Sequence, residues 1–379
     1  MGYVVKTALT SLSVALLLSS SAAKAEDMDV DALKAVLDEK FAEKGVHEQT
    51  PGCSVGVIKD GAYILNQSYG AANLEHGIPL SSKGIFRTGS LSKQFTAMAI
   101  ALLAEDGKLD LDADIHTYLP DVMDYGHKVT VRQMVYHVSG IPDYEPGLEA
   151  LKTADGKDLR LGNQDYLTID EFYQRAKNIP LFATPETKWA YSNTAYFLLS
   201  QVVKKVSGMT LRQYADINIF NPLGMTKTFF NDDVNDIVPD RVDGYWRLED
   251  GTYKIYMTNL SWVGDGGVYT SMDDFIKWDQ NWYDNKLGRD PKALMGLVLN
   301  PYDMDVGDGR KYAFGVFVGE HKGYQRINHT GSWVGFTTYY TRYPDLNLSL
   351  VSFCNSNQAT PRITMQLENY MIDSIKGDQ

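Results

Sequence analysis

The stretch from Ser90 to Gly107 constrains the fold most, because an apolar helix follows directly on a serine and a lysine. Its apolar residues recur at i, i+4, i+7, i+8, i+11 and i+12, the stripe of a buried amphipathic helix: Leu91, Phe95, Met98, Ala99, Leu102 and Leu103. Gly107 supplies a left-handed stop just past it. Ser90 therefore begins a helix, and Lys93 follows on the same helix face. A hydroxyl beside an amine that can take its proton is the pattern of an activated nucleophile.

A second serine competes for the role of nucleophile. Gly52 to Gly56 match the pattern G-x-S-x-G, with Ser54 at the centre. That pattern is catalytic where a strand turns sharply into a helix. Here it runs into a strand over 53–58, a turn at 59–61 and a second strand over 62–65, so we expect Ser54 to be an ordinary strand residue.

Residues 1–25 have the composition of a signal peptide. Lys6 precedes an apolar run over 8–18, and Ala23-Lys24-Ala25 is a small-x-small cleavage site. The run is too short to span a bilayer comfortably, and the first cysteine, Cys53, lies well beyond the cleavage site. We therefore expect a periplasmic or secreted protein without a membrane anchor.

Charge and cysteine content exclude several classes of protein. The predicted leader holds two lysines and no acid, so its removal changes the formal net charge from −12 to −14. Such an acidic chain is a poor binder of nucleic acid or of anionic membranes. Two cysteines cannot build a disulfide scaffold or a zinc site. We expect Cys53 and Cys354 to be neighbours on paired strands, and favour two buried thiols over a bridge.

The order of the patterns predicts an α+β fold. A helix over 29–44 and two strands precede Ser90, and four strand-like runs and a final helix follow residue 295. Helical patterns dominate between them. We expect one antiparallel sheet built from both chain ends (26–89 and 296–379), flanked by the terminal helices, with residues 90–295 as an inserted all-helical subdomain. The strand runs after residue 295 are 312–318, 325–329, 335–343 and 346–354, and the final helix should bury Ile363, Leu367, Tyr370, Met371 and Ile375.

Three short motifs occur in a fixed order along the chain. They are Ser90-Leu91-Ser92-Lys93, Tyr191-Ser192-Asn193 just before a helix, and His329-Thr330-Gly331-Ser332, expected between two strands. With these motifs and their flanks, the chain resembles the penicillin-recognising serine hydrolases over nearly its whole mature length. That family includes class C β-lactamases, serine D-Ala-D-Ala carboxypeptidases, D-aminopeptidases and related esterases, and carries S-x-x-K, Y-x-N and K/H-T/S-G in this order. The matching flanks are 86–96, 137–142, 222–225 and 264–267.

The resemblance implies a role for each motif residue. Ser90 would attack a carbonyl to form an acyl-enzyme, while Lys93 and the Tyr191 phenol, within hydrogen-bond reach of each other, would pass its proton to the leaving group. Asn193 would donate to substrate or hold Lys93. The remaining motif residues would form the oxyanion hole and hold the substrate edge: the backbone N–H groups of Ser90 and Ser332, with His329, Thr330 and Gly331 on the strand.

Two departures from the family pattern affect the expected substrate. His329 replaces the usual lysine, so a partly charged imidazolium would hold a substrate carboxylate less firmly. Glu186 stands where the family often has glycine. We favour D-amino-acid-containing peptides as substrates, with an esterase of weak class C-like β-lactamase activity as the alternative. A non-catalytic penicillin- or peptide-binding sensor and an α/β-hydrolase using Ser54 are alternatives of other kinds.

Histidine and tryptophan positions add little chemistry of their own. We expect His137 to brace a loop, and His76 and His116 to be structural or exposed. The histidines lack metal-binding spacing, so we expect no metal and no other cofactor, and a peptide or small molecule as the substrate. Four tryptophans are candidates for a cleft lining, although core packing is the commoner role of aromatic residues: Trp189, Trp246, Trp262 and Trp333.

Overall fold

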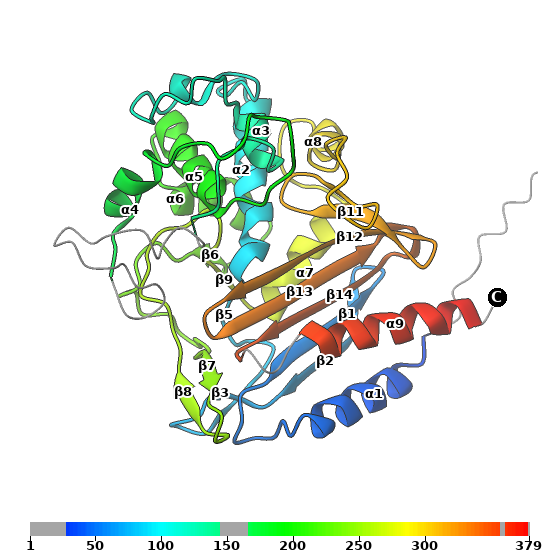
Figure 1. Cartoon of the computed structure of the whole chain (residues 1–379). Coiled ribbons are helices and arrows are strands. Elements are labelled where there is room, and N and C mark those ends of the chain that lie inside the picture. The colour runs from blue at the N-terminus through cyan, green and yellow to red at the C-terminus, as the bar shows by residue number, and fades with distance from the viewer. Residues whose placement is uncertain (1–27, 145–165, 357–360, 378–379) are drawn as a thin grey trace, which may run out of the picture.

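A computed structural model describes residues 28–144, 166–356 and 361–377, and its centre is a seven-stranded antiparallel sheet. The strand order is β10-β11-β12-β13-β14-β1-β2, so the strands of the two chain ends meet at the β14–β1 pair (Figure 1). The prediction of one sheet from both chain ends is confirmed. The seven strands are β1 (Cys53–Lys59), β2 (Ala62–Tyr69), β10 (Lys311–Tyr312), β11 (Phe317–His321), β12 (Tyr324–Trp333), β13 (Phe336–Tyr343) and β14 (Leu348–Cys354).

The terminal helices cover one face of the sheet. Helices α1 (Val30–Glu43) and α9 (Pro361–Gly377) lie side by side on it in Figure 1 and share an apolar cluster with β1 and β14. Asp29 caps α1 by accepting a hydrogen bond from the backbone of Ala32 at 2.9 Å. One predicted core position in α9 is wrong: Tyr370 is 39% exposed, and Ile372 is buried instead.

Helix α7 (Met272–Asn281) covers the opposite face. Its Phe275 meets Phe353 of β14 and Tyr340 of β13 edge-on, with ring centroids 5.3 Å and 4.9 Å apart. Trp278 of the same helix lies 4.4 Å from Phe95 of α2 (Lys93–Glu105). The sheet, α7 and α2 therefore form successive layers of one continuous core, which fixes the start of α2 relative to the sheet.

Residues 90–295 are mostly helical but not all-helical, which corrects the prediction. Four short strands lie within this part, because β9 pairs with β5 and β6, and β7 pairs with β8 in a hairpin. The boundaries of this part as a folding unit stay a prediction. The remaining helices are α3 (Val131–Val135), α4 (Ile169–Ala176), α5 (Asn193–Ser207), α6 (Leu211–Ala215) and α8 (Pro291–Val298); the remaining strands are β3 (Ala71–Asn73), β4 (Ile78–Pro79), β5 (Phe86–Arg87), β6 (Phe229–Phe230), β7 (Tyr245–Arg247), β8 (Tyr253–Ile255) and β9 (Val268–Thr270).

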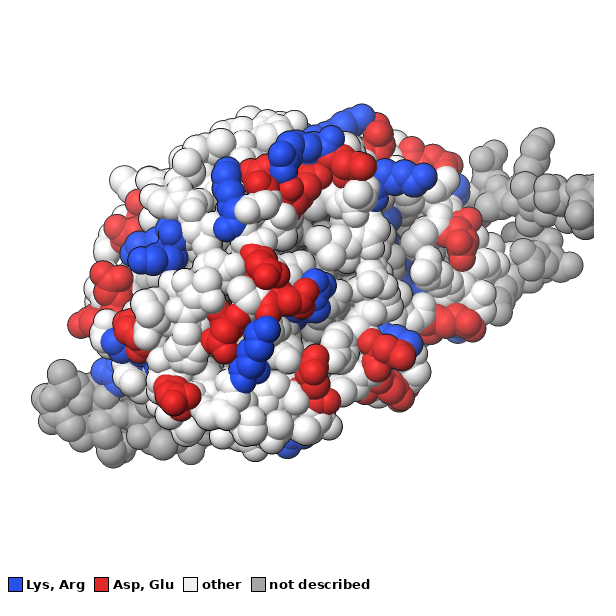
Figure 2. All heavy atoms as spheres, turned by 90° about the horizontal axis from the view of Figure 1, so that it is seen from above, with Lys and Arg blue, Asp and Glu red and all other residues white. Residues whose placement is uncertain are grey.

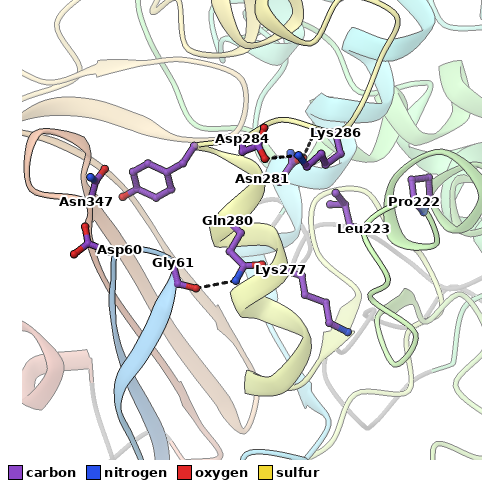
Figure 3. A pocket seen from close by; sticks show the side chains of 11 residues that line it. Asp60, Gly61, Pro222, Leu223, Lys277, Gln280, Asn281, Asp284, Lys286 and Asn347 are labelled. Atoms are coloured by element: carbon purple, nitrogen blue, oxygen red, sulfur yellow. Dashed lines mark hydrogen bonds and ion pairs between the residues drawn. The ribbon is translucent and has the colours of Figure 1, made fainter.

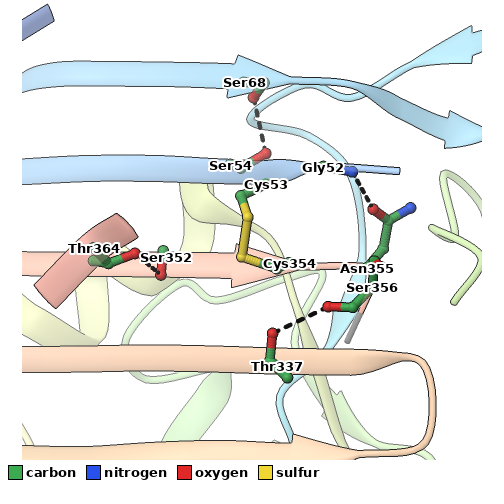
Figure 4. Close-up of a disulfide and its surroundings, with 10 residues drawn as sticks. All are labelled: Gly52, Cys53, Ser54, Ser68, Thr337, Ser352, Cys354, Asn355, Ser356 and Thr364. Atoms are coloured by element: carbon green, nitrogen blue, oxygen red, sulfur yellow. Dashed lines mark hydrogen bonds between the residues drawn. A yellow bond between two sulfur atoms is a disulfide. The ribbon is translucent and has the colours of Figure 1, made fainter. Parts of the chain in front are cut away.

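Cys53 and Cys354 form a disulfide, so the preference for two buried thiols was wrong (Figure 4). The register of β1 on β14 places the two residues directly opposite each other, with 4.0 Å between their Cα atoms. Both are buried in the cluster beneath α1 and α9. The bridge joins β1 and β14, which are the first and last strands of the sheet in chain order and neighbours within it, across 301 residues of sequence.

The surface charges and the helices bear on the location of the protein. On the face shown in Figure 2, acidic and basic side chains are interspersed rather than separated into large single-sign areas. Within the described ranges, none of the helices has the length and hydrophobicity needed to cross a bilayer. The predicted signal peptide, residues 1–25, lies outside the described residues.

Candidate active site

Ser90 lies in a short 3₁₀ turn, η1 (Gly89–Ser92), that leads directly into α2. The buried hydroxyl of Ser92 donates to the Gly89 carbonyl at 2.6 Å and accepts from the backbone N–H of Val268 at 3.0 Å. From the other side, the Thr338 hydroxyl donates to the carbonyl of Thr88 at 2.8 Å. The turn is thus tied both to β9 and to β13, and Ser90 itself remains half-buried at a helix start, as predicted.

Lys93 is fully buried, and its ammonium reaches the nucleophile candidate. Its Nζ donates to Ser90 Oγ at 3.2 Å, to Asn193 Oδ1 at 2.6 Å and to the backbone carbonyl of Asp265 at 2.6 Å. Three acceptors on three different segments therefore fix the position of one amine. The structure brings together Ser90, Lys93 and Asn193, which are up to 103 positions apart in the sequence.

Asn193 holds Lys93, one of the two roles open to it from the sequence. Ser192 caps α5 by accepting from the backbone of Ala195 at 3.0 Å, which places Asn193 at the first helical position. Its side-chain oxygen accepts from Lys93, and its Nδ2 donates to Asp143 Oδ2 at 3.1 Å. Asp143 was missed by the sequence reasoning, although it directly follows the matching flank 137–142.

Tyr191 lies beside Lys93, but its hydroxyl is not hydrogen-bonded to the amine. Lys93 Nζ is 4.7 Å from the centroid of the Tyr191 ring and so faces the ring. The hydroxyl oxygen is enclosed and has no hydrogen-bond partner within the described structure. Burial raises the pKa of Tyr191 well above its usual value, and the nearby Ser90 hydroxyl opposes that shift. The expected contact between phenol and amine is therefore wrong, because Lys93 is turned toward Asn193 and Asp265.

The His329–Ser332 motif lies inside β12 rather than between two strands, which corrects the prediction. A Cβ atom on Gly331 would lie 2.0 Å from the Thr88 carbonyl oxygen and 3.1 Å from Ser90 N. A Cβ on Gly89, where φ is +54°, would lie 2.8 Å from Ser332 N. Glycines at these two positions allow β12 to approach the turn, so the backbone N–H groups of Ser90 and Ser332 lie in one region.

His329 is buried on the same face of β12 as Gly331, and its ring centroid lies 6.1 Å from that of Tyr191. Its side chain is 2% exposed, whereas Thr330 and Ser332 are exposed on the other face of the strand. Burial, with the positive charge of Lys93, lowers the pKa of His329 to about 3. The expected partly charged imidazolium is therefore wrong: His329 is a neutral group whose Nε2 lies 3.2 Å from the Tyr312 hydroxyl.

The family model for beta-lactamase matches residues 37–369, which is most of the chain. The protein belongs to the beta-lactamase family of serine hydrolases. It is 29% identical over 338 residues to penicillin-binding protein 4* of Bacillus subtilis, covering 84% of this chain and 71% of that protein. It is 25% identical over 319 residues to a D-aminopeptidase of Gluconobacter oxydans, covering 84% of this chain but only 58% of the relative.

Solved structures of the family share the fold. The octameric penicillin-binding protein homologue from Pyrococcus abyssi superimposes with a TM-score of 0.78 at 27% identity, over 91% of this chain and 78% of that one. A D-amino acid amidase from Ochrobactrum anthropi gives a TM-score of 0.72 at 22% identity, over 92% and 98% of the two chains. The second likeness concerns the fold alone.

Two positions of the family pattern, His137 and Glu186, shape the loop before the Tyr191 motif. His137 is buried, and its Nδ1 accepts from the backbone of Ser192 at 3.1 Å, so its expected loop-bracing role is confirmed. Glu186 has a left-handed backbone with φ of +65°, a conformation that favours the glycine often found in the family. Its side chain compensates by accepting from the Tyr302 hydroxyl at 2.8 Å, which ties the loop to the segment after α8.

The other candidate positions separate clearly from the site. Ser54 is a buried residue of β1 that lies 2.8 Å from the Ser68 hydroxyl, so its expected strand role is confirmed (Figure 4). Trp262 and Trp333 line a hollow beside Ser90, whereas Trp246 is 44% exposed in a β hairpin and Trp189 packs on His137. Among the described residues, no group of three or more His, Cys, Asp or Glu side chains could hold a metal ion.

Two hollows in the described structure differ in size and in the residues that line them. The larger, of about 600 Å³, lies between α7 and the β1–β2 turn, where Gln280 donates to the Gly61 carbonyl at 2.7 Å (Figure 3). None of the three motifs contributes to its lining. The smaller is lined by Ser90, Asn193 and Ser332. Chemistry therefore favours the smaller hollow as the candidate substrate site.

Proposed function

We propose that this family member is an exported serine hydrolase that works through an acyl-enzyme on Ser90, with D-amino-acid-containing peptides as its substrates. The observation that carries the proposal is the 3.2 Å contact of Lys93 Nζ with Ser90 Oγ. Asn193 and the Asp265 carbonyl hold the amine in place for that contact. A proton acceptor held this close is what a serine hydroxyl needs to become a nucleophile.

The acylation step follows from this geometry. Lys93, after loss of its own proton, takes the Ser90 proton as the uncharged amine while Ser90 Oγ forms a bond to the substrate carbonyl carbon. The Tyr191 phenol, protonated because its pKa is raised, donates to the departing nitrogen or oxygen and is reprotonated from Lys93. The bond to the leaving group then breaks, and water later releases the acyl group by the reverse sequence of proton transfers.

The oxyanion that forms in this step needs two donors. The backbone N–H groups of Ser90 and Ser332 are suited to it, because the close approach of Gly331 and Gly89 brings their segments together. Each such donor typically contributes about 10²–10³ in rate. Beyond Asn328, β12 has no described strand partner on its β11 side, so an extended substrate can align along that edge.

The substrate class rests on the relatives. Their names include D-aminopeptidase and penicillin-binding protein, while the chain spans less than two thirds of the length of the D-aminopeptidases. An esterase with weak β-lactamase activity is the second candidate, favoured by the neutral state of His329, which offers no positive charge for a substrate carboxylate on that strand. The buried Lys93 contact argues against a non-catalytic sensor.

Hydrolysis of matched substrates distinguishes these candidates. We expect kcat/KM for D-alanine 4-nitroanilide to exceed that for the L-enantiomer by at least about tenfold, a difference of about 1.4 kcal/mol in transition-state binding. Turnover of 4-nitrophenyl butanoate without either anilide would replace the peptidase with the esterase. Covalent labelling of Ser90 without turnover of any substrate would favour the sensor.

A further inference from the structure

The hollow beside Ser90 contains one acidic and one basic residue whose buried side chains the proposed mechanism does not use. Arg87 precedes the η1 turn in β5 and is 5% exposed, and Asp265 is 7% exposed in the loop before β9. Both line the hollow together with Ser90, Ser332 and Trp333. Burying a charge costs free energy unless it is paired and hydrogen-bonded, so each ion calls for a partner.

Arg87 has none among the described residues. Its guanidinium carbon lies 5.5 Å from the centroid of the Trp333 ring, and Nη1 is enclosed without any acceptor. Burial lowers its pKa, and the charge of Asp265 is among the groups that oppose this shift. Even so, a guanidinium keeps its proton at any physiological pH. The site therefore holds a positive group with a free donor.

Asp265 is only half satisfied. Its Oδ2 accepts from the Tyr144 hydroxyl at 2.5 Å, and that hydroxyl accepts from Trp262 Nε1 at 3.2 Å. Its Oδ1 is enclosed and without a partner in the described structure. Arg87 and Asp265 do not pair with each other, because Arg87 Nη1 and Asp265 Oδ1 both lack a hydrogen-bond partner in the described structure. Gly266 keeps the space beside them free of a side chain, because a Cβ there would be 3.8 Å from Arg87 Nη2.

We propose that Arg87 and Asp265 form a dipolar binding site for substrates whose acyl group carries both a carboxylate and an ammonium. The carboxylate would accept from Arg87 Nη1, and the ammonium would donate to Asp265 Oδ1. A ligand with one charge would leave the other buried group without a partner. The inference rests on the proposed acyl-enzyme at Ser90 and adds a substrate class to it.

The position of the hollow assigns the site to the acyl side of the scissile bond. The leaving group must take a proton from Tyr191 or Lys93, so it faces those two side chains. Neither of them lines the hollow, whereas Ser90 and Ser332 do. The part of the substrate that stays on the enzyme therefore faces Arg87 and Asp265.

Four matched 4-nitrophenyl esters test the site in the wild-type protein. Butanoyl is neutral, 3-aminobutanoyl carries an ammonium, succinyl a carboxylate, and β-aspartyl both, with both enantiomers of the chiral esters included. After subtraction of the rate without enzyme, which for the succinyl and β-aspartyl esters includes attack of their own carboxylate, we expect kcat/KM for one β-aspartyl enantiomer to exceed that for butanoyl by at least about tenfold, and to exceed both singly charged esters. Equal values across the series would overturn the dipolar site but leave the acyl-enzyme standing. Absence of turnover of all four would overturn both.

Two substitutions test which residue recognises the ammonium and which recognises the carboxylate. We expect Asp265→Asn to lower the ratio of 3-aminobutanoyl to butanoyl about tenfold, and Arg87→Gln to lower the ratio of succinyl to butanoyl by a similar factor. Arg87→Lys should keep part of the carboxylate preference. The exposed pair Asp308→Asn and Arg289→Gln, with side chains 92% and 67% exposed, are matched controls that should change neither ratio. Ratios unchanged in the site variants would overturn the assignment, and the wild-type series decides alone if a variant does not fold.

Discussion

His329 illustrates how burial determines the chemistry of a single residue. Its pKa in the folded protein, about 3, lies below the value of ~6.5 expected in the unfolded chain. Between those two values the unfolded state binds a proton that the folded state does not, so the free energy of unfolding rises with pH. The stabilising contribution is present above about pH 6.5 and is lost as the pH falls toward 3.

Replacement of His329 should therefore reduce the acid sensitivity of the protein. One such proton contributes up to ~1.4 kcal/mol per pH unit. We expect the free energy of unfolding of His329→Gln to fall by about 1 kcal/mol less than wild type between pH 6 and pH 5, measured with urea. His76→Gln, at an exposed position, is the control. Parallel losses in wild type and His329→Gln would contradict a buried neutral histidine.

At the same scale, the sequence predicted which residues meet but not how they meet. Ser90, Lys93 and Asn193 were recognisable because their motifs keep fixed spacings on helix starts. Two predictions were wrong: a hydrogen bond between Tyr191 and Lys93, and a charged His329. Both features depend on side-chain direction and burial, which distant segments determine. The two buried ions, Arg87 and Asp265, lie in recognised flanks, yet nothing in the local sequence indicates that they lack partners.

Among the elements, the contact of β12 with the η1 turn is the one on which the proposed oxyanion hole depends. In Gly331→Ala the new Cβ would lie 2.0 Å from the Thr88 carbonyl oxygen and would push the strand from the turn. We expect the acylation rate with 4-nitrophenyl butanoate to fall by at least about 10², comparable to the loss of one oxyanion donor.

Gly296→Ala is a matched control for that change. Gly296 lies in α8, where a Cβ would meet nothing within 4 Å, so the same added methyl group should leave the rate unchanged. Circular dichroism shows whether both variants keep the fold. An unchanged acylation rate in folded Gly331→Ala would mean that the close approach of β12 is not needed.

The disulfide between β1 and β14 stabilises the sheet without touching the site. Cys53 and Cys354 lie in the cluster under α1 and α9, while the motif residues lie on the side of α2 and α5. We expect the double variant Cys53→Ala/Cys354→Ala to lose about 2–5 kcal/mol of unfolding free energy. Its ester hydrolysis below the unfolding transition should stay within about twofold of wild type. Equal unfolding free energies, measured with guanidinium, would contradict a structural role for the bridge.

The elements themselves followed well from the sequence because their signals are local. Helix caps and the β1–β2 hairpin, with left-handed Asp60 and Gly61, have characteristic residues at fixed offsets. The disulfide and the short strands β6 to β9 were missed or misjudged, since strand pairing between distant segments leaves no periodic signal. The extent of β12 was misjudged for the same reason, because its pairing with β13 continues through the Gly331 position.

For the whole molecule, the composition of residues 1–25 predicts export. The small-x-small site at Ala23-Lys24-Ala25 predicts cleavage after Ala25. We expect protein recovered from the periplasm or medium of expressing cells to begin at Glu26, as read by N-terminal sequencing. A full-length chain retained in the cytoplasm would contradict the signal peptide.

The central claim is that Ser90 carries the acyl group. Intact mass spectrometry after brief incubation with a penicillin, a D-Ala-D-Ala peptide and a 4-nitrophenyl ester tests it most directly. We predict a mass increase equal to the acyl group of at least one reagent in wild type and in Ser54→Ala, located by digestion to the peptide that contains Ser90, and none in Ser90→Ala. An acyl mass that persists in Ser90→Ala and disappears in Ser54→Ala would contradict the account.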